Sequence, residues 1–121
     1  MIDLRRLFKS FKYAIAGLIY AFKEEQNFQI HTITGVVAIV LGFILKISFF
    51  EWIALVICIS LVLMAELVNT IFERIVDILK PRLHPYAEKI KDMMAGIVIV
   101  ATVLSLVLGL LIFLPKILVF F

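Results

Sequence analysis

The chain has 121 residues, of which 64% are hydrophobic, and its mean hydropathy is +1.18. A soluble domain has about 45–50% apolar residues, so this composition excludes an ordinary soluble protein and indicates one integral membrane domain. The net charge is +3, and the sequence contains no basic stripe with interleaved aromatic residues. Nucleic-acid binding is therefore excluded as well.

Residues 3–25 alternate charged and apolar side chains with the period of a helix. The apolar side consists of Leu4, Leu7, Phe8, Phe11, Ile15, Leu18, Ile19 and Phe22. A basic amphipathic helix of this kind suits the plane of a membrane interface. We therefore predict an N-terminal amphipathic surface helix over residues 3–25, with packing onto the protein's own core as the alternative.

Three apolar segments follow, and we predict that they cross the membrane as helices over about residues 30–47, 50–72 and 93–114. The predicted fold class is therefore all-α integral membrane. Two of these segments carry small residues at helical spacing, which favours close helix packing. They are Gly35, Ala38 and Gly42 in the first span and Ala101, Ser105 and Gly109 in the third.

The ends of the spans carry their own signals. Trp52 is predicted to anchor the start of the second span at the membrane interface. Prolines 81 and 85 are expected to break the helix after the second span. A short helical segment over residues 86–92 is expected next, and Pro115 is expected to end the third span.

Lysine and arginine counts predict the orientation of the chain. The N-terminal segment and the second connection carry five each, whereas the first connection and the C-terminus carry one each. Because positive residues remain on the cytoplasmic side, the N-terminus is expected inside and the C-terminus outside.

A polar stripe interrupts the end of the second span. Glu66, Asn69, Glu73 and Asp77 fall within about 80° of one another on a helix. Glu66 lies roughly 25 Å along the helix from residue 49, just inside a hydrocarbon layer of about 30 Å. Such a stripe is costly in a membrane unless it binds something.

The predicted topology brings further polar residues to this level, from the flanks of the other two spans. Glu25 and Glu73 can hold Mg²⁺, which takes one or two carboxylates and completes its shell with phosphates and water. Lys91 beside them can neutralise phosphate oxygens. Glu66 lies deeper and suits a general base acting on a lipid alcohol.

Other functions were weighed against phosphoryl transfer. A small cation or proton transporter would place polar groups near mid-membrane, whereas here they crowd one rim. A structural membrane adaptor leaves the aligned carboxylates unexplained. The chain has no glycine-rich phosphate loop, and His31 and His84 lack ligand spacing, so both are expected to have capping or structural roles. Arg74 and Asp77 taken alone read as solvated charges at a helix end.

Two groups of motifs carry a resemblance. The second half contains Glu66-Leu67-Val68-Asn69-Thr70, followed by Glu73, Asp77, His84 and Lys91-Asp92. The first half contains Phe11-Lys12-Tyr13-Ala14, Gly17 and Glu25-Gln26-Asn27-Phe28-Gln29-Ile30-His31. At this spacing the chain resembles the small bacterial integral-membrane diacylglycerol kinase/undecaprenol kinase family over essentially its whole length.

The resemblance implies a homotrimer in the bacterial inner membrane that transfers the γ-phosphate of MgATP to a membrane lipid alcohol. It implies that Glu66 is the general base, that Asn69 orders the site, and that Glu25 and Glu73 bind Mg²⁺. Lipid contacts are implied for Glu66 and Ala95. Nucleotide contacts are implied for Arg6, Tyr13, Glu25, Glu73, Arg82, His84, Lys91 and Asp92.

The form of the first polar motif, Glu-x-Asn-Phe-x-Ile-His, is similar to the undecaprenol kinase branch, so undecaprenol is the favoured substrate and diacylglycerol the alternative. The chain departs from the family at Ile71-Phe72, where a small and an aliphatic residue are more usual. It also departs at Lys80-Pro81, an insertion that leaves the nucleotide contacts of the following loop the least secure.

Overall fold

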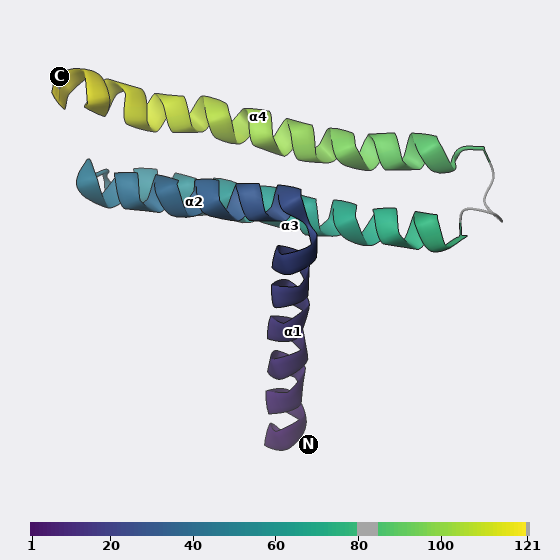
Figure 1. The fold of residues 1–121 in the computed structure, drawn as a ribbon. Helices are drawn as coiled ribbons and strands as arrows, with labels where there is room; N and C mark the ends of the chain where they lie inside the picture. The colour runs from purple at the N-terminus through teal and green to yellow at the C-terminus, as the bar shows by residue number, and fades with distance from the viewer. Residues whose placement is uncertain (80–84, 121) are drawn as a thin grey trace.

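The computed structural model describes residues 1–79 and 85–120. The elements of this part of the chain are α1 (Leu4–Glu24), α2 (Gln26–Ile44), α3 (Phe49–Leu79) and α4 (Ala87–Phe120). Helices α2, α3 and α4 run side by side, and α1 projects away from them to one side (Figure 1). These three are long and apolar enough to cross a membrane. The predicted all-α class with three candidate spans is confirmed.

Side chains satisfy free backbone groups at both ends of helix α1. The carboxylate of Asp3 accepts hydrogen bonds from the backbone N–H groups of Arg5 (3.0 Å) and Arg6 (3.3 Å), an N-cap. At the other end Glu25 has extended backbone (φ −114°, ψ 110°), which separates α1 from α2. Gln29 Nε2 donates to the carbonyl of Phe22 (2.6 Å) and fixes the corner between the two helices.

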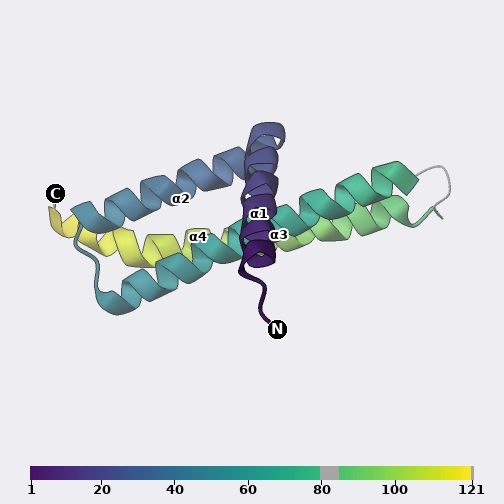
Figure 2. The same ribbon diagram turned by 90° about the horizontal axis from the view of Figure 1, so that it is seen from below.

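The α1–α2 corner lies partway along the α3–α4 pair. Both views show α3 and α4 extending well beyond it (Figure 1 and Figure 2). Helix α3 has 31 residues, about 46 Å at helical rise, whereas the hydrocarbon layer is about 30 Å thick. The second half of the polar stripe therefore lies on a part of α3 that α2 does not reach.

A short turn joins α2 to α3 at the opposite end of the bundle. Lys46 takes a left-handed backbone conformation (φ 52°) in this turn. Ser48 and Glu51 then form a capping box: the Ser48 N–H donates to the Glu51 carboxylate (2.9 Å), and the Glu51 N–H donates to Ser48 Oγ (3.3 Å). These reciprocal bonds explain why α3 begins at Phe49.

Small residues on α2 permit its close approach to α3, as predicted. A Cβ added to Gly35 would lie 3.0 Å from Ile59, and one added to Gly42 would lie 2.7 Å from the Trp52 ring. Trp52 also packs against Phe43, with ring centroids 4.7 Å apart. The first predicted span thus packs through its small-residue face, although α2 starts at Gln26, inside the polar motif.

One boundary prediction for the third span is wrong, because helix α4 continues through Pro115 to Phe120. The predicted helical segment that leads into this span is found as the first turns of α4, from Ala87. Proline is tolerated in a spanning helix where neighbouring groups compensate for the lost hydrogen bond. Here the next residue, Lys116, pairs with Glu51 of α3 (Nζ to Oε1, 3.2 Å), which holds the continuing helix against α3.

Candidate active site

Glu66 and Asn69 are the two polar residues that are buried in the described part of the chain, with 2% and 6% of their surface exposed. Both lie on α3, one turn apart, and Glu66 faces His31 of α2. A buried carboxylate loses its hydration and must recover that free energy from its neighbours. The partners of these two residues therefore indicate whether the site is structural or functional.

Glu66 has weak partners for so buried a charge. Its Oε2 atom lies 3.8 Å from Nε2 of His31 on α2, a separation beyond ordinary hydrogen-bond length. The Asn27 side chain is a further polar neighbour, and Glu25 and Glu73 act on Glu66 electrostatically. The carboxylate is thus incompletely compensated, which suits a group that accepts a proton from a substrate.

Asn69 presents an unpaired oxygen to the site. Its Nδ2 donates to Glu73 Oε1 (3.2 Å), and its Oδ1 is buried with no hydrogen-bond partner among the described residues. Buried acceptors are normally paired, so an orphaned oxygen points to a ligand that the protein alone does not supply. Amide and carboxylate oxygens are ligands that hard divalent cations accept.

Glu25 reaches the same rim from the α1–α2 corner. Its Oε1 atom accepts a hydrogen bond from Arg74 Nη2 at 2.6 Å, linking the corner to α3. Among the residues that the structure describes, no three His, Cys, Asp or Glu side chains gather into a ready-made metal cage. Two carboxylates with an amide oxygen still fit Mg²⁺, because this ion takes its remaining ligands from phosphates and water.

Lys91 of α4 completes the rim. Its ammonium group contacts Asp77 Oδ1 on α3 at 3.0 Å. Asp77, which the sequence alone indicated as a solvated charge, thus holds Lys91, a predicted phosphate ligand, in place. Asp92 is exposed beside Lys91, and Ala95 lies one turn further along α4, half-buried.

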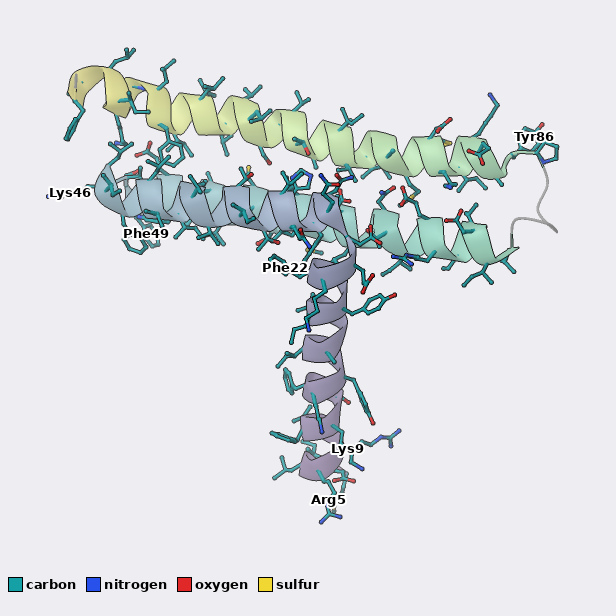
Figure 3. All side chains as sticks on the ribbon, in the orientation of Figure 1. Arg5, Lys9, Phe22, Lys46, Phe49 and Tyr86 are labelled. Atoms are coloured by element: carbon teal, nitrogen blue, oxygen red, sulfur yellow. The ribbon has the colours of Figure 1, made fainter. Side chains whose placement is uncertain are left out.

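The remaining predicted nucleotide contacts are not brought together in one chain. Arg6 and Tyr13 are exposed on α1. Figure 3 shows Arg5, the neighbour of Arg6, at the end of α1 far from the other helices, whereas Phe22 lies close to them. Arg82 and His84 lie outside the described residues. These four contacts stay predictions.

Two residues of the rim were not predicted from the sequence as site residues. His31, assigned a capping or structural role, contacts Glu66, and Arg74, read as a solvated charge, contacts Glu25. His31 and Asn27 are four residues apart and share a face of α2, a spacing that could have indicated a common polar partner. The Arg74–Glu25 pair joins residues 49 apart, and no local spacing signals such a contact.

An apolar cavity begins at His31, the residue that contacts the buried Glu66 carboxylate. It has a volume of about 340 Å³ and lies between α2, α3 and α4, with His31 near one end and Phe113 near the other. Gly35 and Gly109 both line it, and the predicted small-residue seam of α4 is thus partly open. Ser105 of that seam does contact α3, where its hydroxyl donates to the Cys58 carbonyl (3.4 Å).

Fold and site together define a helical multi-pass membrane protein with carboxylates, an orphaned amide oxygen and cations at one rim. The family model of prokaryotic diacylglycerol kinase matches residues 12–113, and the chain belongs to this family. The predicted resemblance is confirmed. The chain is a member of a family of kinases.

Individual relatives of the chain are also named as lipid kinases. The chain is 40% identical over 114 residues to a Bacillus subtilis protein named undecaprenol kinase, covering 94% of this chain and 93% of the relative. It is 37% identical over 113 residues to a Synechocystis diacylglycerol kinase, covering 93% and 65% of the two chains. It is 38% identical over 89 residues to a Helicobacter pylori diacylglycerol kinase, covering 74% and 70%.

Proposed function

We propose that this protein transfers the γ-phosphate of MgATP to the hydroxyl group of a membrane lipid, with undecaprenol as the favoured acceptor. The observation that carries the proposal is the placement of Glu66. Its carboxylate is buried and incompletely paired, and it lies 3.8 Å from His31, a residue that lines the apolar cavity. A lipid alcohol that reaches this depth brings its hydroxyl to the carboxylate while its hydrocarbon remains on the membrane side.

In this proposal the stripe residues divide the work by depth. Glu66 accepts the proton of the lipid hydroxyl while the hydroxyl oxygen attacks the γ-phosphorus, the bond to the β–γ bridging oxygen breaks and ADP leaves. Glu25 and Glu73 would hold Mg²⁺, which neutralises charge on the phosphates when bound. Asn69 orders Glu73 through the 3.2 Å hydrogen bond and offers its free oxygen to the same site.

Nucleotide and lipid contacts extend the proposal along the rim. Lys91 and Asp92 on α4 would face the phosphates and Ala95 the lipid. The favoured lipid rests on the 40% identity to the undecaprenol kinase of Bacillus subtilis and on the first polar motif. Relatives named diacylglycerol kinase support diacylglycerol as the alternative. The further nucleotide contacts would come from Arg6, Tyr13, Arg82 and His84.

We also propose how the chain sits in the bacterial inner membrane. Helix α1 would lie in the cytoplasmic interface, since it projects sideways from the three long helices and its apolar side is exposed, with Phe8 at 74% and Phe11 at 61%. The clustered lysines and arginines favour a cytoplasmic N-terminus and an outside C-terminus. The spans would cover about residues 30–47, 50–72 and 93–114, forming a single membrane kinase domain over residues 1–121.

The homotrimer is proposed from the family resemblance. Open space around Gly96 and Gly109, where an added Cβ would meet nothing within 4 Å, would permit close approach of a neighbouring helix. Crosslinking of the purified protein in detergent micelles, followed by electrophoresis, measures the subunit number directly. A ladder that ends at two subunits, or that never passes one, would contradict the trimer.

An ATP-dependent phosphorylation assay in mixed micelles tests the function, with undecaprenol and diacylglycerol offered side by side. We expect labelled product with both lipids and faster turnover with undecaprenol. Faster turnover with diacylglycerol would reverse the substrate order. No labelled lipid with either would contradict the kinase proposal and favour the transporter alternative.

A further inference from the structure

The Arg74–Glu25 ion pair places a cation on a carboxylate that the proposed function reserves for a metal. The two atoms are 2.6 Å apart, and the pair joins the α1–α2 corner to α3. The Arg74 side chain is 52% exposed and that of Glu25 is 22% exposed. The contact is therefore short but open to water on the arginine side.

A guanidinium group and Mg²⁺ cannot both be held at full strength by one carboxylate. The guanidinium, with charge +1, and Mg²⁺, with charge +2, repel each other when they lie a few ångströms apart at a protein surface. Metal binding at Glu25 must therefore loosen the contact with Arg74. Because Arg74 is half exposed, its side chain can swing away without disturbing buried packing.

The place to which Arg74 can swing is set by its neighbours on α3. It follows Glu73, the second proposed metal ligand, and lies one turn before Asp77, which holds Lys91 at 3.0 Å. Phosphates held near Glu73 and Lys91 would therefore be close enough for the Arg74 side chain to contact them. The planar guanidinium binds two phosphate oxygens at once, which a lysine cannot do.

We propose that Arg74 is a phosphate-binding residue, and that it is paired with Glu25 until metal and nucleotide bind. The inference rests on the proposed function, because it takes Glu25 as a metal ligand and a nucleotide triphosphate as the anion. Arg74 has two successive partners: Glu25 in the free enzyme, and the phosphates in the complex.

The exchange predicts opposite effects of one substitution on two binding reactions. Arg74→Gln removes the competitor from Glu25, so binding of Mn²⁺ alone, a paramagnetic replacement for Mg²⁺, should tighten about threefold or more. The same substitution removes a charge-assisted phosphate contact, so MgATP binding should weaken about tenfold. The full-length protein in detergent micelles is used, with electron paramagnetic resonance for Mn²⁺ and equilibrium dialysis for MgATP.

Two further variants make the measurement specific. Arg74→Lys keeps the charge but not the planar fork, and we expect MgATP affinity between those of wild type and Arg74→Gln. Lys9→Gln removes one exposed positive charge from the far part of α1 and should change neither binding reaction (Figure 3). Circular dichroism and size-exclusion elution show that each variant has folded, and the Arg74→Lys result stands if Arg74→Gln does not fold.

Each other outcome overturns the inference. Unchanged MgATP affinity in Arg74→Gln would remove Arg74 as a phosphate ligand. Weaker binding of both Mn²⁺ and MgATP would make Arg74 a structural support of Glu25. Failure of the proposed function is a separate result, because wild-type protein would then phosphorylate neither lipid; failure of this inference leaves wild-type turnover intact.

Discussion

Two glutamates of α3, Glu51 and Glu66, stand 15 residues apart and so about 22 Å along one helix, yet their surroundings differ completely. Glu51 accepts a hydrogen bond from the Ser48 N–H at 2.9 Å and contacts Lys116 at 3.2 Å. Glu66 is almost fully buried and has His31 at 3.8 Å as its nearest basic group. The Glu51 carboxylate therefore has close hydrogen-bond and ion-pair partners, whereas the Glu66 carboxylate does not.

The difference separates a structural carboxylate, Glu51, from the proposed catalytic one, Glu66. Glu51 ends a turn, caps a helix and ties α4 to α3, so every bond it makes serves the fold. Burying the Glu66 carboxylate costs free energy, and its neighbours compensate little of that cost. Substitutions at the two ends of α3 should therefore affect different measurements.

The largest expected effect is on turnover at Glu66. Glu66→Gln keeps the size of the side chain and one acceptor oxygen but cannot accept the proton, so turnover should fall by about 10²–10⁴-fold. The mixed-micelle phosphorylation assay measures this. The thermal stability should be unchanged or higher, because an undercompensated buried charge is removed. Near-wild-type turnover would mean that Glu66 is not the base.

A smaller effect is expected at Glu73. Glu73→Gln removes a charge from the proposed metal pair, so the Mg²⁺ concentration for half-maximal turnover should rise by about tenfold or more. The Asn69 contact is kept in altered form, since an amide oxygen can still accept from Nδ2. A Mg²⁺ titration that matches wild type would remove Glu73 from the metal site.

At the Glu51 end, packing should matter more than charge. Gly42→Ala places a Cβ 2.7 Å from the Trp52 ring, next to Glu51, and should destabilise the fold by about 1–3 kcal/mol. Gly17→Ala is the matched control, because its Cβ would meet nothing within 4 Å and it lies on α1, outside the proposed subunit contact. Loss of helical circular dichroism on heating compares the two. Equal stability of both variants would contradict the tight α2–α3 contact.

The smallest effect is expected for Glu51→Gln. The side chain is only half-buried, water screens its contact with Lys116, and glutamine retains an oxygen for the Ser48 N–H. Turnover should equal that of wild type, with a slight loss of thermal stability. A large loss of turnover would show that the two ends of α3 are not functionally separate.

Much of the fold follows from local sequence, and the parts that do not follow are contacts over long separations. The apolar runs and the small residues of α2 indicate the spans and their packing, because helix formation and face patterning are local. The end of α4 could not be predicted from local sequence, because Pro115 indicates a helix break. The helix continues past it, and Lys116 pairs there with Glu51, a residue distant in the sequence.

The candidate site shows the same division. The stripe from Glu66 to Asp77 is visible from helical spacing alone, and the structure places Glu25 and Lys91 at its level. The partners His31 and Arg74 depend on how α2 and the α1–α2 corner sit against α3. Charge and spacing indicate which residues are expensive to bury, whereas tertiary geometry decides which neighbours compensate them.

Glu25 has two positions in the molecule at once: its side chain lies in the candidate site, and its extended backbone is the joint between α1 and α2. Helix α1 has 21 residues, so its tip lies about 31 Å along the helix from this joint. A rotation of about 10° there moves the tip of α1 by about 5 Å. Any change of partner at the Glu25 carboxylate would be magnified at the N-terminus, where a spin label near Lys9 would register it.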